Sequence, residues 1–247
     1  MRLVALIPAR YGSTRFPGKP LAPILGRPLI QWVWEQAQKV PGLDGIWVAT
    51  DDERIKAAVE GFGGHALMTR PDHRSGSDRL AEAAALLNLA PDDIIVNIQG
   101  DQALFPPEVV AQMAGLLARA PQAVMTTPAR RITDTAAASS PHVVKVVFDQ
   151  NHRALYFSRS PLPYWRSGDA PYFYQHIGIY AYRAEFLQKF VGLPPGRWEQ
   201  AESLEQLRAL EHGYPIHILE TTGDTLEIDT PEDLRRAEEY FGGGPGS

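Results

Sequence analysis

"RLVALIPARYGSTRFPGKP", residues 2–20, decides the fold class, because an apolar run leads directly into a basic loop that contains glycines. A run without polar interruption, as at residues 3–9, is typical of a central strand in a parallel sheet that is buried on both faces. The loop then carries Arg10, Arg15 and Lys19 together with two glycines. Three cations directly after a first strand indicate a binding site for a polyphosphate.

Two common phosphate-binding loops are excluded by spacing and chemistry. A Walker A loop has four residues between its glycines and then Lys-Ser/Thr. Here five residues separate Gly12 from Gly18, and Lys19 is followed by Pro20, which has neither a hydroxyl nor an N–H. The G-x-G-x-x-G fingerprint of dinucleotide-binding folds is also absent, which disfavours a nicotinamide dehydrogenase with Asp51 as the ribose-binding acid.

Composition excludes several further classes of protein. The chain has 247 residues, 44% of them hydrophobic, no cysteine and a formal net charge of −5. No segment carries an extended run of Lys or Arg. These values predict a single globular domain with no disulfide, no thiol catalysis and no nucleic-acid polymer as partner. The apolar stretch at the N-terminus is too short for a signal peptide or a membrane span, so we expect a cytoplasmic protein without a membrane partner. Residues 242–247 read as a flexible tail.

Strands alternate with helices over the first half of the chain. The expected strands are residues 2–9, 45–52 and 93–101, the expected helices are residues 28–40, 52–63 and 78–90, and residues 65–77 are interpreted as a loop. This alternation predicts an α/β fold with a Rossmann-like, doubly wound, mostly parallel sheet.

The middle of the chain has a different pattern. Residues 142–163 read as two strands around a polar turn, and residues 176–183 as another strand. Antiparallel strands within a parallel fold predict a small inserted β subdomain, a lid or dimerisation element, at residues 130–190. Helices are expected at residues 184–193 and 201–213, and a last element at residues 228–241.

Two aspartates are candidate ligands for Mg²⁺, which prefers carboxylate oxygens and substrate phosphates. Asp101 ends the strand-like segment "NIQGD", where an aspartate also suits an ordinary turn. In "IDTPEDL", Thr230 and Asp233 fit a helix cap, which leaves Asp229 as either a metal ligand or a simple exposed residue.

With these segments in view, the chain resembles the CMP-Kdo synthetases, the 3-deoxy-manno-octulosonate (Kdo) cytidylyltransferases. The likeness covers nearly the whole chain in the order of that family, and the segments that carry it are "IPARYGSTRFPGKPL", "VATDDERI", "MTRPDHRSGSDRLAE", "VNIQGDQ", "VKVVFDQNHRALYFSRSPLP", "QHIGIYAYR", "ESLEQLR" and "IDTPEDL". Each motif is weak alone, but eight in sequence are highly specific.

The resemblance implies a fold of the nucleotide-diphospho-sugar transferase type and a defined reaction. Members of this family transfer CMP from CTP to the anomeric hydroxyl of Kdo, release pyrophosphate, require Mg²⁺ and form homodimers through the inserted strands, in the biosynthesis of lipopolysaccharide-type glycans. Two alternatives stay open. One is a cytidylyltransferase for another sugar acid, such as 8-amino-Kdo or a nonulosonate, and the other is a catalytically silent homologue that binds nucleotide or sugar.

The resemblance also implies roles for individual residues. Those expected to act in catalysis are Lys19, Arg10, Asp101 and Asp229, the last two as metal ligands. Those expected to bind the nucleotide are Arg10, Ser13, Arg15, Lys19, Arg70, Ser75, Ser77, Asp78 and Gln99. Those expected to bind the sugar acid are Gln99, Arg159, His176, Tyr180, Glu199 and Glu202. For His176 we expect a hydrogen bond to substrate rather than general-base catalysis.

Three departures from the family pattern concern the sugar. The family usually has Glu-Pro after "QGD", where this chain has Gln102-Ala103, and Arg before the histidine of "HxGIY", where this chain has Gln175. A glycine near the C-terminal aspartate is replaced by Glu227. We expect Gln102 and Gln175 to remove charges close to the sugar, so the motifs support cytidylyl transfer better than they define the sugar.

Overall fold

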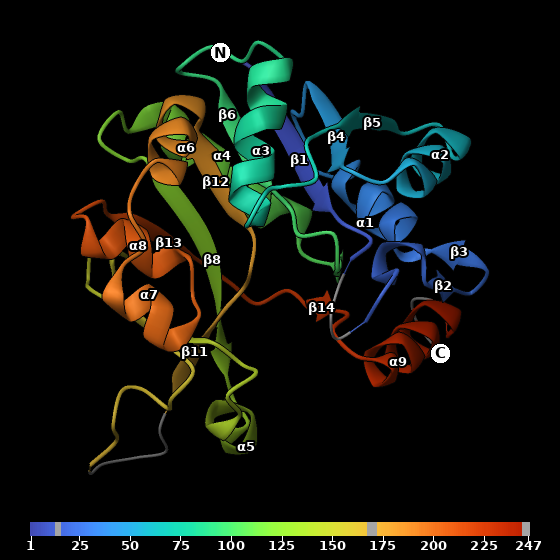
Figure 1. The fold of residues 1–247 in the computed structure, drawn as a ribbon. Coiled ribbons are helices and arrows are strands. Elements are labelled where there is room, and N and C mark those ends of the chain that lie inside the picture. The colour runs from blue at the N-terminus through green and yellow to red at the C-terminus, as the bar shows by residue number, and fades with distance from the viewer. Residues whose placement is uncertain (13–15, 167–171, 244–247) are drawn as a thin grey trace.

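The computed structural model describes residues 1–12, 16–166 and 172–243, and its main feature is a ten-stranded sheet with helices on both faces (Figure 1). The strands of this sheet are β1 (Leu3–Ala9), β4 (Gly45–Thr50), β5 (His65–Met68), β6 (Ile94–Asn97), β8 (Met125–Ile132), β9 (Lys145–Phe148), β10 (Ala154–Ser158), β11 (Phe173–His176), β12 (Tyr180–Arg183) and β13 (Ile216–Thr221). Two short pairs lie outside it: β2 (Pro23–Ile24) with β3 (Arg27–Pro28), and β7 (Gln102–Leu104) with β14 (Leu226–Glu227). The helices are η1 (Lys19–Leu21, a 3-10 turn), α1 (Leu29–Ala37), α2 (Glu53–Gly61), α3 (Gly76–Leu86), α4 (Pro107–Arg119), α5 (Thr135–Ser139), α6 (Ala184–Val191), α7 (Arg197–Glu202), α8 (Gln206–Glu211) and α9 (Pro231–Gly242).

The parallel half of the sheet is built around β1. This strand pairs in parallel with β4 on one side and β6 on the other, and β4 pairs in parallel with β5. Leu6 and Ile7 are both fully buried although they point to opposite faces, as the unbroken apolar run predicted. One face packs on α1 through Ile30 and Val33, and the other packs on α3 through Leu80. The predicted doubly wound α/β fold is therefore confirmed.

The antiparallel half meets the parallel half at β12, which lies between β6 and β8 and runs antiparallel to both. Its neighbour in the chain, β11, pairs antiparallel with β8 and β9, and β9 forms a hairpin with β10. His176 of β11 pairs with Ala129 of β8, and Ala181 of β12 pairs with Thr126 of β8. The β11–β12 segment therefore advances five residues where β8 advances three. The pairing with β8 is irregular at this step, which contains Gly178. The antiparallel strands predicted for residues 130–190 are present, and they continue the main sheet.

Two predicted elements were wrong in detail. Residues 65–77 are not all loop, because His65–Met68 form β5 at the edge of the sheet. The residues of this edge strand are exposed or half-buried, so its sequence lacks the long apolar run of a central strand. The helix predicted at residues 201–213 is interrupted by Ser203, whose φ of 53° ends α7. The irregular backbone then allows Leu204 to turn into the core.

The C-terminal helix begins as its sequence predicts. Thr230 accepts a hydrogen bond from the Asp233 N–H, and the Asp233 carboxylate accepts one from the Thr230 N–H, which closes a capping box. The predicted flexible tail starts where α9 ends, and most of it, residues 244–247, lies outside the described residues. Within the described ranges, none of the helices combines the length and apolar character needed to cross a membrane.

Candidate functional site

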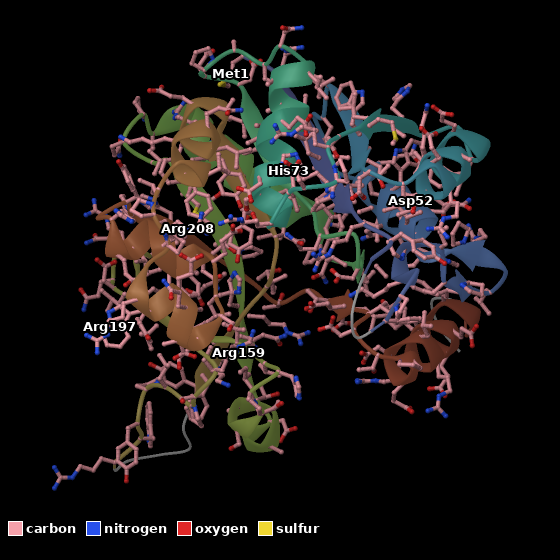
Figure 2. All side chains as sticks on the ribbon, in the orientation of Figure 1. Met1, Asp52, His73, Arg159, Arg197 and Arg208 are labelled. Atoms are coloured by element: carbon pink, nitrogen blue, oxygen red, sulfur yellow. The ribbon has the colours of Figure 1, made fainter. Side chains whose placement is uncertain are left out.

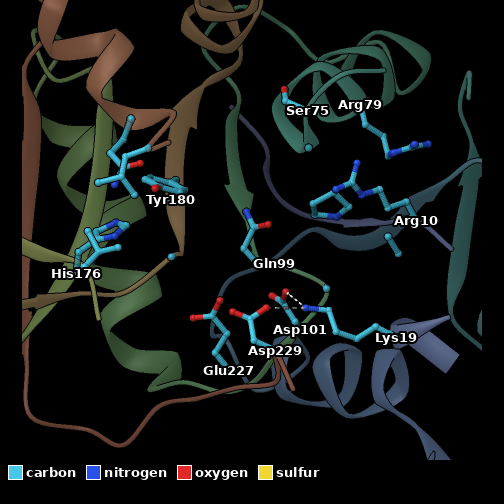
Figure 3. Close-up of a pocket in the computed structure, with 18 of the residues that line it drawn as sticks. Arg10, Lys19, Ser75, Arg79, Gln99, Asp101, His176, Tyr180, Glu227 and Asp229 are labelled. Carbon is cyan, nitrogen blue, oxygen red and sulfur yellow. Dashed lines mark hydrogen bonds and ion pairs between the residues drawn. The ribbon is translucent and has the colours of Figure 1, made fainter. Parts of the chain in front are cut away.

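A cavity of about 420 Å³ lies where β1 and β6 end, between the parallel and antiparallel halves of the molecule (Figure 3). One wall comes from the N-terminal part of the chain and includes Pro8, Arg10, Lys19, His73, Arg74, Ser75, Arg79 and Gln99. The opposite wall includes His142, Val144, Arg159, Gln175, His176, Tyr180, Leu204 and Gln206. Three carboxylates, those of Asp101, Glu227 and Asp229, lie at one end of the cavity. Figure 2 shows His73 beside the start of α3 and Arg159 below α7, on opposite walls.

Gly100 lets the two central strands approach each other at the cavity. A Cβ atom at this position would lie 2.7 Å from the carbonyl oxygen of Pro8, closer than real Cβ contacts allow. The missing side chain therefore permits the contact that brings Gln99 and Asp101 beside the opening loop. Gln99 is held by a hydrogen bond from its Nε2 to Asn97 Oδ1 at 3.0 Å.

Lys19 links the opening loop to both predicted metal ligands. Its Nζ lies 2.6 Å from Asp101 Oδ2 and 3.1 Å from Asp229 Oδ1 (Figure 3). Burial lowers the pKa of Lys19, but the charges and hydrogen bonds of Asp101 and Asp229 outweigh that effect, and the pKa is raised. Lys19 therefore stays protonated at neutral pH. Three segments predicted separately to act in catalysis thus meet at one point.

Glu227 is the third carboxylate of this group. Ligand oxygens of Asp101, Glu227 and Asp229 all lie within 4.8 Å of one another. Glu227 is exposed as a residue, but desolvation of its carboxyl group and the charges of Asp101 and Asp229 raise its pKa to about 8. Asp101 also has a buried oxygen, Oδ1, with no hydrogen-bond partner among the described residues. An orphaned oxygen and three converging carboxylates suit a hard divalent cation such as Mg²⁺.

Of the nine residues predicted to bind the nucleotide, four line the cavity, two lie outside the described residues and three lie elsewhere. Arg10, Lys19, Ser75 and Gln99 line the cavity as expected. Ser13 and Arg15 lie outside the described residues.

The remaining three predicted nucleotide residues, Arg70, Ser77 and Asp78, do not line the cavity. The exposed Arg70 pairs with Asp72, Ser77 is buried and donates to Glu205, and the Asp78 carboxylate accepts the Ser75 N–H in the cap of α3. Ser77 and Asp78 therefore hold the start of α3, as a buried anchor and a helix cap, whereas Arg70 lies in an exposed ion pair.

The predicted sugar residues also separate. Arg159, His176 and Tyr180 line the cavity. His176 is 8% exposed, and its Nε2 lies 2.9 Å from Thr127 Oγ1. Burial lowers the pKa of His176 to about 3, so the imidazole is neutral at physiological pH. A neutral, hydrogen-bonded ring agrees with the expected role in substrate contact.

Glu199 and Glu202 do not line the cavity. Glu199 forms an ion pair with Arg208 and accepts the Gly196 N–H at the start of α7. Glu202 accepts hydrogen bonds from Ser158 Oγ and from the Arg159 N–H. Both carboxylates bind other residues of the wall and do not face the cavity.

Lys145 is a buried cation that supports the same wall. Its side chain is fully buried, and its Nζ donates to the carbonyl oxygens of Ser140, Val143 and Arg159 at 2.8, 2.5 and 2.6 Å. The three protons of the ammonium group are thereby used. Lys145 ties the loop that carries His142 to the end of β10, where Arg159 lies.

The departures from the family pattern lie in different places. Gln102 is 2% exposed, donates to the Leu104 carbonyl and does not line the cavity. Gln175 lines the cavity, and its Oε1 accepts a hydrogen bond from Arg130. Glu227 also lines it. Two of the three departures therefore line the cavity.

Five charged or polar cavity residues were not predicted to bind substrate: His73, Arg74, Arg79, His142 and Gln206. Arg79 is 4% exposed and pairs with Asp51 at 3.1 Å, which shows that Asp51 holds an arginine at the wall. Arg79 and Gln206 lie inside the segments "SGSDR" and "ESLEQLR", which are the signals that could have identified them.

A doubly wound sheet with a basic opening loop and an acidic cluster beyond its strand ends defines an α/β nucleotidyltransferase. The sequence model of one family, described as cytidylyltransferase, matches residues 4–221. The chain belongs to the cytidylyltransferase family.

Individual relatives are similar over almost their whole length. The chain is 52% identical over 246 residues to the 8-amino-3,8-dideoxy-manno-octulosonate cytidylyltransferase of Shewanella sp. (strain W3-18-1), which covers 99% of this chain and 100% of the relative. It is 54% identical over 239 residues to the 3-deoxy-manno-octulosonate cytidylyltransferase of Syntrophobacter fumaroxidans, at 95% and 94% coverage. The solved structure of a CMP:2-keto-3-deoxy-manno-octonic acid synthetase complexed with CTP matches with a TM-score of 0.92 and 43% identity, over 99% of this chain and 100% of that one.

Proposed function

We propose that this enzyme transfers CMP from CTP to the anomeric hydroxyl of Kdo and releases pyrophosphate. In this reaction the hydroxyl oxygen forms a bond to the α-phosphorus, the bond from that phosphorus to the β-phosphate oxygen breaks, and the hydroxyl proton is lost to solvent. The observation that carries the proposal is the meeting of Lys19, Asp101 and Asp229 at the end of the cavity. The Kdo-type relatives support the choice of substrates.

The N-terminal wall is the proposed site of the triphosphate. Arg10 and Lys19 lie on this wall with Ser75 and Arg79. Phosphoryl transfer depends mainly on positioning and on neutralising charge. Lys19 and Arg10 would stabilise the negative charge that develops on the leaving pyrophosphate, and the raised pKa of Lys19 keeps its charge available.

The carboxylates of Asp101 and Asp229 are the proposed ligands of Mg²⁺. When bound there, the cation would lower the pKa of the attacking hydroxyl and offset phosphate charge. Lys19 orients both carboxylates through its two hydrogen bonds. Because His176 is neutral and bonded to Thr127, it orients the sugar rather than removing its proton.

A second candidate substrate is 8-amino-Kdo. Its support is the 52% identity to the Shewanella enzyme, close to the 54% found for the Kdo-type relative. Gln175 and Glu227 face the cavity and differ from the pattern we expected for the family, so they are the positions to examine for a change of sugar.

The test is pyrophosphate release from the purified protein with Mg²⁺, comparing CTP with ATP, GTP and UTP and offering Kdo, 8-amino-Kdo and a nonulosonate separately. Release with CTP and Kdo is the expected result. Release only with 8-amino-Kdo or a nonulosonate would move the proposal to that sugar. No release with any pair would contradict the proposed activity and favour a silent binding protein.

We also propose that the enzyme is a homodimer that uses the antiparallel strands. The edge strand β10 exposes Leu155, and the segment that follows it exposes Tyr164, which is 88% accessible. Tyr172, directly before β11, is also exposed. Large apolar side chains beside an open sheet edge are commonly covered by a partner. Light scattering coupled to gel filtration would give the mass in solution, and a monomer would contradict this proposal.

A further inference from the structure

We propose that Glu227 is a third carboxylate ligand of the divalent cation, so that this enzyme binds the ion before the nucleotide arrives. The inference rests on the proposed function for the presence of the cation beside Asp101 and Asp229. It concerns a residue that departs from the pattern expected for the family, where a glycine offers no ligand.

The backbone places Glu227 in line with Asp229. Glu227 belongs to β14 and pairs with Gln102 of β7, so it lies across from the residue that follows Asp101. The Ile228 N–H donates to the Asp101 carbonyl at 2.9 Å, which fixes the two segments together. Alternate residues of an extended segment point to the same side. Ile228 is fully buried, and Glu227 and Asp229 on either side of it face the cavity.

The two aspartates and Glu227 have different partners. Lys19 bonds to Asp101 and to Asp229. The Glu227 carboxylate has no hydrogen bond or ion pair with any described residue, and in Figure 3 it lies on the side of Asp229 away from Lys19. The orphaned Oδ1 of Asp101 belongs to the same group of oxygens. One cation between these three carboxylates would give a partner to Glu227 and to the buried Oδ1 together.

The charges of these side chains explain why the cation would bind without the nucleotide. With a cation bound, all three carboxylates are ionised and carry three negative charges, and Lys19 supplies one positive charge. Mg²⁺ is usually held by one or two carboxylates and completes its coordination with substrate phosphates. A third carboxylate supplies in advance part of the charge that a phosphate otherwise brings.

The experiment is a titration of the full-length protein with Mn²⁺ as a spectroscopic substitute for Mg²⁺, followed by electron paramagnetic resonance without any nucleotide or sugar. We expect one site on the unaltered protein. In Glu227→Gln, which keeps the shape, and Glu227→Gly, which restores the residue expected for the family, affinity should fall by about tenfold or more. Glu60→Gln, which removes an exposed charge on α2, is the matched control and should bind as the unaltered protein does.

Two outcomes would overturn the inference. One is unchanged Mn²⁺ affinity in both Glu227 variants, and the other is the absence of a site on the unaltered protein without CTP. If the affinity is unchanged and the KM for the sugar acid rises, Glu227 is a sugar contact instead. Because the titration contains no substrate, its result is independent of whether Kdo is the acceptor. Thermal unfolding of each variant checks that the fold is kept.

Discussion

Lys19 Nζ bridges Asp101 and Asp229, which lie 82 and 210 residues away in the sequence, at 2.6 and 3.1 Å. The ammonium group therefore holds together the opening loop, the end of β6 and the segment before α9. Its charge lies between the two carboxylates.

Loss of this bridge should slow turnover more than it affects folding. Lys19→Met removes the charge and keeps most of the apolar stem, so we expect the rate of pyrophosphate release to fall by about a hundredfold or more. Lys19→Arg keeps the charge and should retain more activity. A Lys19→Met variant with an ordinary rate would show that the bridge has no part in the reaction.

The two aspartates should be needed for turnover and not for the fold. Asp101→Ala and Asp229→Ala should each lose turnover by orders of magnitude, because each removes a proposed metal ligand and no core contact. Asp224→Ala, which removes a 75% exposed carboxylate, is the control and should keep its rate. Thermal unfolding reports whether the fold survives, and near-normal rates in either of the first two variants would contradict the metal assignment.

Gly100 should not tolerate a methyl group. In Gly100→Ala the new Cβ would meet the Pro8 carbonyl at 2.7 Å, and relief requires β1 and β6 to move apart. We expect a loss of about 1–3 kcal/mol in the free energy of unfolding. The control is Gly61→Ala, at the end of α2, where a Cβ meets nothing within 4 Å. Urea denaturation of both variants measures the difference, and equal stabilities would contradict the proposed close approach.

Lys145 should affect binding of the sugar acid, through the wall that contains Arg159, and not binding of CTP. Lys145→Met leaves three partly buried carbonyl oxygens without their donor, and we expect a loss of about 2–4 kcal/mol in the free energy of unfolding. Because the loop with His142 and the end of β10 then separate, the KM for the sugar acid should rise while the KM for CTP stays constant. Lys56→Met on the surface of α2 is the control. A parallel rise of both KM values would indicate a general structural effect.

His176 should make stability depend on pH. Its pKa is about 3 in the folded protein, against about 6.5 in an unfolded chain. The unfolded state therefore binds a proton first as the pH falls below 6.5, and the folded state is destabilised down to about pH 3. The slope should reach about 1.4 kcal/mol per pH unit for this one group.

Urea denaturation of the unaltered protein and of His176→Gln between pH 7 and pH 4 measures this contribution. The variant has no imidazole to protonate, so its free energy of unfolding should fall less steeply. Parallel curves would contradict the lowered pKa of His176.

The sequence predicted the parts of this molecule whose pattern is local. An apolar run without interruption predicted β1, and the spacing of Thr230 and Asp233 predicted the start of α9. The edge strand β5 was missed because its half-exposed residues lack that pattern. Contacts between distant segments were equally hidden: nothing in the neighbourhood of Glu202 shows that it binds the Arg159 N–H, 43 residues away.

The same distinction applies to the site. Motif resemblance located Lys19, Asp101 and Asp229 correctly in one cavity, since each lies at the end of an element. It could not decide which way a charged side chain turns. Gln102 turns inward to the Leu104 carbonyl, whereas Glu227, its partner across the β7–β14 pair, lines the cavity.

The cavity has walls of separate origin. The wall with the basic loop is drawn from residues 8–99, and the facing wall from residues 142–206. In the proposed reaction, substitutions in the second stretch can change which sugar acid binds without changing the wall proposed for CTP. Substitutions in residues 142–206 would therefore change one side of the cavity and leave the other as it is, whereas a substitution at the acidic end would affect the whole proposed site.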